Sequence, residues 1–145
     1  MKKQRSNPGR PVDRLSLLWL ALALGLSLFA VNGRWDIALA AWLFPVFLLR
    51  FARTQNPVVG FLGAWFVSTA AFLFWYWQTL SSLSVFFIGI GVIAAAFQAL
   101  PYLLDRIFSF RLRGFLSTLI FPLASVLIDY LKTQVSPLGS IGSIA

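Results

Sequence analysis

Long apolar runs divide almost the whole chain into five segments, and most of the basic residues stand in the short stretches between them. The runs lie at about residues 15–31, 36–52, 58–77, 83–104 and 115–131. A helix that crosses the hydrocarbon core of a bilayer needs about 20 mainly apolar residues, and each run reaches or approaches that length. Because backbone groups in lipid must be hydrogen-bonded within their own segment, such runs predict helices. The expected fold class is all-α, a polytopic bundle of about five transmembrane helices.

The composition agrees with lipid as the solvent and excludes several kinds of chemistry. Hydrophobic residues make up 59% of the chain and charged residues only 11%, whereas soluble domains carry about 25% charged residues. The chain has no cysteine and no histidine, which rules out disulfides, a thiolate nucleophile, a histidine base and the usual zinc sites. We therefore predict no catalytic residue, no metal site and no cofactor.

The first apolar run is either a signal peptide or a first transmembrane helix. A basic tail, residues 1–14, precedes it, as it would precede either. The run 15–31 exceeds the roughly 7–15 apolar residues of a signal peptide. The sequence 29–33 (FAVNG) also offers no convincing small-x-small cleavage site. We therefore expect an uncleaved first helix.

The basic residues decide the expected orientation. The run 36–52 is the weakest of the five, since Pro45 interrupts it and should kink a helix. If this run crosses the membrane, ten basic residues lie on one side, leaving Arg34 and Lys132 on the other; otherwise the division is six and six. Lys and Arg are concentrated on the cytoplasmic side. The sequence thus predicts a cytoplasmic N-terminus and an extracytoplasmic loop at 132–145. The net charge of +8 is explained by topology and anionic headgroups, not by nucleic acid.

Few polar residues remain as candidates for a site. Asp129 lies within the last run, where an ionisable group is costly and often functional, but Lys132 is spaced to pair with it at i,i+3. Gln98 either hydrogen-bonds a substrate in a lateral opening or, as we favour, joins two helices. The other acidic residues are expected in loops or at the interface beside basic neighbours, with Asp105 next to Arg106: Asp13, Asp36 and Asp105.

Small residues at i,i+4 spacing predict close helix crossings within the bundle. Such pairs stand in the third and fourth apolar runs, as Ala64 with Ser68 and Ala95 with Ala99. Small side chains allow two backbones to approach closely in lipid. We therefore expect these positions to lie between helices.

Three segments carry a family resemblance. They are residues 42–49 (WLFPVFLL), 72–77 (FLFWYW) and 121–131 (FPLASVLIDYL), the last followed by 136–143 (SPLGSIGS). These segments resemble the proline-bearing second helix, the end of the third helix, and the Phe-Pro-Leu-Ala helix with its Pro-x-Gly loop in the apolipoprotein N-acyltransferases. The family commonly has an aromatic residue near Ile141, so this sequence departs from the pattern there.

The resemblance implies a multi-pass protein of the bacterial inner membrane. Enzymes of that family move an acyl chain from a phospholipid to a lipoprotein, using Glu, Lys and Cys of a nitrilase-like domain outside the membrane. No counterpart of these residues exists in this chain, so we expect a membrane-anchoring, lipid-facing module that is inactive alone. Its expected partners are membrane phospholipid and either a lipoprotein substrate or a catalytic domain supplied elsewhere. The alternative is a small non-enzymatic membrane protein, such as a transport subunit or assembly partner.

Overall fold

The computed structural model describes residues 14–30, 37–79, 84–109, 111–112 and 114–135. These ranges contain five α-helices and no strand. In chain order the helices are α1 (Arg14–Ala30), α2 (Ala38–Thr54), α3 (Pro57–Thr79), α4 (Val85–Phe108) and α5 (Leu116–Val135). Each apolar run of the sequence corresponds to one helix, which confirms the all-α prediction.

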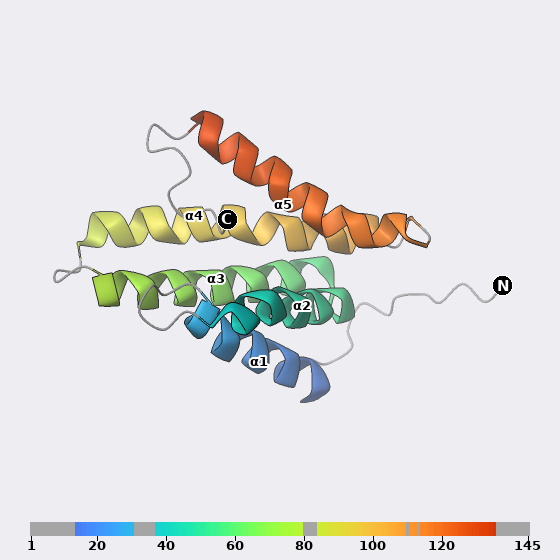
Figure 1. The fold of residues 1–145 in the computed structure, drawn as a ribbon, viewed down its shortest axis with the longest axis horizontal. Coiled ribbons are helices and arrows are strands. Elements are labelled where there is room, and N and C mark those ends of the chain that lie inside the picture. The colour runs from blue at the N-terminus through green and yellow to red at the C-terminus, as the bar shows by residue number, and fades with distance from the viewer. Residues whose placement is uncertain (1–13, 31–36, 80–83, 110, 113, 136–145) are drawn as a thin grey trace.

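The helices lie along one long axis and alternate in direction (Figure 1). Short connections favour antiparallel neighbours, and α1 packs on α2, α3 on α4, and α4 on α5. Helices α1, α2 and α3 also contact one another, and α2 contacts α4. Among the described helices, only α4 has a backbone that packs closely against that of α5. Four helices therefore form a packed group, and α5 is attached to one side of it.

Small side chains fill the crossings of this group. Ala64 of α3 and Ala99 of α4 are fully buried, and Ala95 is nearly so, as expected for three of the four positions predicted at close crossings. The fourth, Ser68, is only partly buried. A β-carbon added at Gly60 would stand 3.1 Å from the carbonyl oxygen of Ala52, so α2 and α3 approach almost backbone to backbone. In lipid, where no hydrophobic force draws helices together, close contact of this kind stabilises a bundle.

The outward surface of the bundle is apolar. Trp42, Phe115 and Val85 are exposed by 80%, 75% and 85%, and large apolar patches of this kind mark surfaces that meet lipid or another protein. Among the described residues, α3, α4 and α5 are long and apolar enough to cross a membrane, and α1 is a shorter apolar helix. The chain is thus an all-helical protein with helices suited to a bilayer.

Two helix ends differ from the sequence-based expectation. Helix α4 continues to Phe108 and α5 to Val135, so the polar loops predicted to begin at residues 105 and 132 begin later. The reason is that charged side chains in both extensions have partners inside the fold, which removes the need to leave the helix. The positions predicted for Asp13, Arg34 and Asp36 fall outside the described residues.

Candidate functional site

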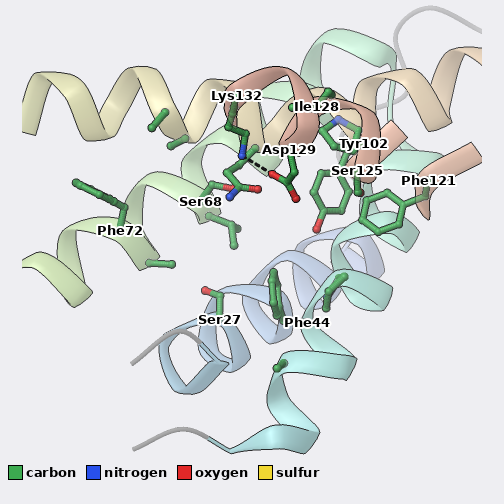
Figure 2. Close-up of a pocket in the computed structure, with 18 of the residues that line it drawn as sticks. Ser27, Phe44, Ser68, Phe72, Tyr102, Phe121, Ser125, Ile128, Asp129 and Lys132 are labelled. Atoms are coloured by element: carbon green, nitrogen blue, oxygen red, sulfur yellow. Dashed lines mark hydrogen bonds and ion pairs between the residues drawn. The ribbon is translucent and has the colours of Figure 1, made fainter. Parts of the chain in front are cut away.

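A cavity of about 470 Å³ lies between α5 and the four packed helices. Its volume falls within the roughly 300–1,000 Å³ typical of small-molecule sites. Figure 2 shows Ser125 and Asp129 of α5 facing Phe44 of α2 and Ser27 of α1 across it. The side chains that line the cavity come from all five helices and are Ser27, Ala41, Phe44, Pro45, Val67, Ser68, Ala71, Phe72, Trp75, Ala94, Ala95, Gln98, Pro101, Tyr102, Phe121, Ser125, Ile128, Asp129 and Lys132.

The wall contributed by the packed helices is mainly apolar and built from side chains of two sizes. Ala71 of α3 and Ala94 and Ala95 of α4 leave space that a larger residue would occupy. Aromatic rings bound this space, with Phe72 and Phe121 at opposite ends (Figure 2). Such a wall suits a flexible hydrocarbon, because it offers contact area and few polar groups that would have to be desolvated.

The face of α5 that lines the cavity repeats at helical spacing. Phe121, Ser125, Ile128, Asp129 and Lys132 fall on one side of the helix, as expected for residues separated by three or four positions. Only Ala124 and Ile128 of the described α5 side chains are buried. The inner face of α5 therefore mainly borders the cavity and packs against a neighbouring helix over a smaller part of its length.

An ion pair stands on the α5 side of the cavity, between Phe72 and Phe121 (Figure 2). The Lys132 ammonium lies 2.7 Å from a carboxylate oxygen of Asp129 (Figure 2). Both side chains are partly exposed, 24% for Lys132 and 32% for Asp129, so each keeps donor or acceptor capacity for another group. The i,i+3 pairing predicted from the sequence is confirmed, and the structure adds that the pair lines the cavity.

The structure places Gln98 on the cavity wall. This position is compatible with both predicted roles, a link between two helices and a hydrogen bond to a substrate, and both stay predictions. Ser68 and Tyr102 add hydroxyl groups to the same wall. Sequence reasoning did not single out Tyr102, because an aromatic residue inside an apolar run gives no signal of what it faces.

A second charged cluster lies away from the cavity and corrects the prediction for Asp105. This carboxylate is fully buried and is bound by Arg53, not placed in a loop beside Arg106. Arg53 donates from Nε to Oδ2 at 2.7 Å and from Nη2 to Oδ1 at 2.8 Å, the bidentate arrangement that makes such pairs strong and directional. Arg106 instead donates from Nε to the carbonyl oxygen of Gln55 at 2.7 Å.

The Arg53–Asp105 pair joins α2 to α4 and reaches the start of α5. Nη2 of Arg53 also donates to the carbonyl oxygen of Ser117 at 3.4 Å. The paired residues are 52 positions apart in the sequence, so no local spacing could reveal them. The one available signal was an acidic residue among basic ones at the end of an apolar run, where a partner is required.

The aromatic cluster at the end of α3 divides between two environments. Trp77 is 68% exposed, whereas Tyr76 is only 2% exposed and its ring packs 6.1 Å from that of Phe87. Trp65, further back on α3, donates from its indole N–H to the carbonyl oxygen of Val92 at 2.9 Å. These contacts join α3 to α4, the two helices that form one wall of the cavity.

Within the described residues, no group of three or more His, Cys, Asp and Glu side chains is placed to hold a metal ion. The arrangement offers a mainly apolar cavity with one charged pair on its α5 side. It can bind and orient a molecule that is itself apolar along most of its length and polar at one end.

Comparison with known proteins finds no family model, no curated protein and no solved structure with significant similarity to the chain. The resemblance to the N-acyltransferases therefore depends on the short segments quoted from the sequence. Of these, residues 136–143 lie outside the described part of the chain.

Proposed function

We propose that this chain is a membrane module of five crossing helices that holds one acyl chain of a phospholipid in the cavity beside α5. The observation that carries the proposal is the cavity itself, with its apolar wall and the Asp129–Lys132 ion pair on its α5 side. A phospholipid has the same division into a long apolar part and a charged headgroup. The cavity therefore matches a phospholipid both in shape and in the distribution of apolar and charged groups. A void left by imperfect packing would not need that distribution.

The distribution of charge supports the orientation. The end of the bundle where α1, α3 and α5 begin, here called the basic end, carries Arg14, Arg50, Arg53 and Arg106. At the opposite end Lys132 is the described basic residue. By the positive-inside rule the basic end is cytoplasmic. If the basic residues at the end of α2 lie on the cytoplasmic side with the start of α1, then α2 must also cross the membrane, even though it is short and contains Pro45.

With this orientation, the Asp129–Lys132 pair lies toward the outer leaflet. A headgroup there can accept from the Lys132 ammonium through its phosphate oxygens, a charge-assisted contact at low cost near the interface. The acyl chain then extends from the pair toward Phe121 along the wall of α3 and α4. The module thus holds an outer-leaflet lipid from its side.

The resemblance to the N-acyltransferases supplies the biological setting of the proposal. A module of that family in a bacterial inner membrane would present phospholipid to a catalytic domain for lipoprotein acylation. This chain contains no cysteine on which an acyl intermediate of that family could form. The proposed role is therefore lipid binding and anchoring, without catalysis by these residues.

Retention of phospholipid by the purified protein tests the proposal. We expect native mass spectrometry of the detergent-purified chain to show one bound phospholipid. Ser68→Phe fills the cavity wall of α3 and should remove most of this signal, whereas Leu62→Phe, on the exposed side of the same helix, should not. Equal retention by both variants, or none by the unsubstituted protein, would contradict lipid binding in the cavity. The latter result would favour an assembly partner or a transport subunit.

A further inference from the structure

Helix α5 is the least embedded of the membrane-suited helices. Only 11% of its apolar window is buried, compared with 22% for α3 and 28% for α4. Val126 and Leu123 on its outer side are 69% and 66% exposed. Among the described helices, α4 is the one whose backbone packs against it, because the cavity lies between α5 and the facing sides of α2 and α3.

The two ends of α5 are held very differently. At the basic end, the Ser117 carbonyl accepts from Arg53, and the Ser117 hydroxyl donates to the carbonyl oxygen of Ser109 at 3.4 Å. The ring of Phe121 lies 4.8 Å from that of Tyr102. Arg53 is itself fixed by the buried carboxylate of Asp105. The first turns of α5 are therefore tied to both α2 and α4.

Toward its other end α5 diverges from α4 (Figure 1). The ion pair there joins Asp129 to Lys132 on the same helix, so the pair itself moves with α5 as one unit. When this end moves outward, apolar side chains of α5 lose contact with the side chains that line the cavity and gain contact with lipid tails. In a bilayer these are similar in free energy, since association there depends on packing and hydrogen bonds.

We propose that α5 is a lateral gate of the cavity, which pivots about its first turns where Arg53 and Asp105 hold them. Outward movement of the opposite end opens the cavity to the acyl chains of the surrounding leaflet, and inward movement closes it over a bound chain. The Gly114 backbone just before α5 has a φ of 69°, a conformation that glycine adopts without strain, and it lies at the pivot. The biological meaning of the gate rests on the proposed lipid-binding function.

Pulsed electron–electron resonance distances between spin labels test the gate. The chain has no cysteine, so introduced pairs are labelled cleanly. One pair, Thr79→Cys with Thr133→Cys, reports the separation of α3 and α5 at the outer end. A second pair, Thr54→Cys with Thr118→Cys, reports α2 and α5 at the basic end. All four positions are exposed, so the labels disturb little packing.

In lipid nanodiscs the outer pair should show two separations that differ by about 5 Å or more, a displacement of the order of one helical turn. The inner pair should show one. Arg53→Gln should broaden the inner distribution, and Arg50→Gln, a change at an exposed arginine of the same helix, should leave it unchanged. A single outer separation as narrow as the inner one would overturn the gate.

The proposed function and the gate can fail separately. If phospholipid is retained but the outer pair shows one separation, the gate is wrong and lipid binding stands. If the outer pair shows two separations but no phospholipid is retained, α5 pivots as proposed and lipid binding is wrong. A cross-link between the outer cysteines should, in addition, slow exchange of bound fluorescent phospholipid, while a cross-link between the inner cysteines should not.

Discussion

Asp105 shows what a single charged residue does in an otherwise apolar bundle. Its carboxylate is fully buried, and both oxygens accept from Arg53. A buried ion pair contributes little net stability compared with a well-packed apolar pair, but leaving one partner alone is costly. The pair therefore specifies which helices meet, α2 with α4, more than it strengthens the fold.

Removing one side of this pair should destabilise the protein more than removing both. We expect Arg53→Gln to lower the free energy of unfolding by about 2 kcal/mol, below the 3–5 kcal/mol typical of fully buried pairs, because the Arg53 side chain is 39% exposed. The double variant Arg53→Met/Asp105→Leu should recover most of that loss. Denaturant unfolding in mixed micelles, followed by circular dichroism, measures both.

Arg50→Gln serves as the control, since Arg50 is exposed and its guanidinium carbon lies 5.0 Å from the centre of the Trp19 ring. It should change stability by about 0.5 kcal/mol or less. A double variant that is as unstable as Arg53→Gln would show that the pair contributes net stability after all.

Two glycines of α4 offer a matched test of the cavity wall. A β-carbon at Gly91 would overlap the ring of Phe72, which lines the cavity, whereas one at Gly89 would meet nothing within 4 Å. We expect Gly91→Ala to cost about 1 kcal/mol, because the ring must rotate away, and to reduce phospholipid retention. Gly89→Ala should leave retention unchanged and should not lower the free energy of unfolding, because alanine is favoured over glycine inside a helix. Equal effects of the two substitutions would contradict the packing of α3 on α4 described here.

At the scale of helices, run length and the absence of charge were sufficient to predict the elements. Each apolar run folds as one helix, since no other backbone arrangement satisfies its amides in lipid. The end of α4 was missed because Asp105 looks like a loop residue until its partner is known, whereas α5 continues past Lys132 although the pairing of Lys132 with Asp129 was predicted. Arg53 is remote in sequence from Asp105, and this distance hides the reason that α4 continues.

The cavity was beyond sequence reasoning for a related cause. Gln98 and Asp129 stood out as polar groups in apolar runs, and both line it. Ala71 and Phe121 also line it, yet they look like any other residues of a packed face. Whether an apolar helical face meets another helix or borders a space depends on how α5 is attached to the bundle, which no local pattern encodes.

Helix α2 is the element on which the proposed topology depends. Ile37 and Thr54 are exposed and lie at its two ends. If α2 crosses, a membrane-impermeant maleimide added to intact spheroplasts should label Ile37→Cys but label Thr54→Cys only after permeabilisation. Thr133→Cys should behave like Ile37→Cys. Labelling of Ile37→Cys and Thr54→Cys from the same side would show that α2 does not cross and would reverse the orientation of α3, α4 and α5 relative to α1.

At the scale of the whole molecule, two charged pairs bracket an apolar space. Arg53–Asp105 secures the basic end, and Asp129–Lys132 stands beside the cavity near the opposite end. Between them, four helices pack closely while α5 leaves room. The lipid-binding proposal explains why the basic end of the bundle is fixed while a space is left open beside α5.

Photo-cross-linking with a phospholipid that carries a diazirine in the middle of one acyl chain tests this account most directly. After irradiation in nanodiscs and peptide mapping, adducts should concentrate on cavity side chains such as Ser68, Ala95 and Ser125. Ser68→Phe should abolish them, and Leu62→Phe should not. Adducts distributed over the exposed faces of α3 and α4, at Leu62 and Ile93, with none in the cavity, would show that lipid only surrounds the bundle and would contradict the account.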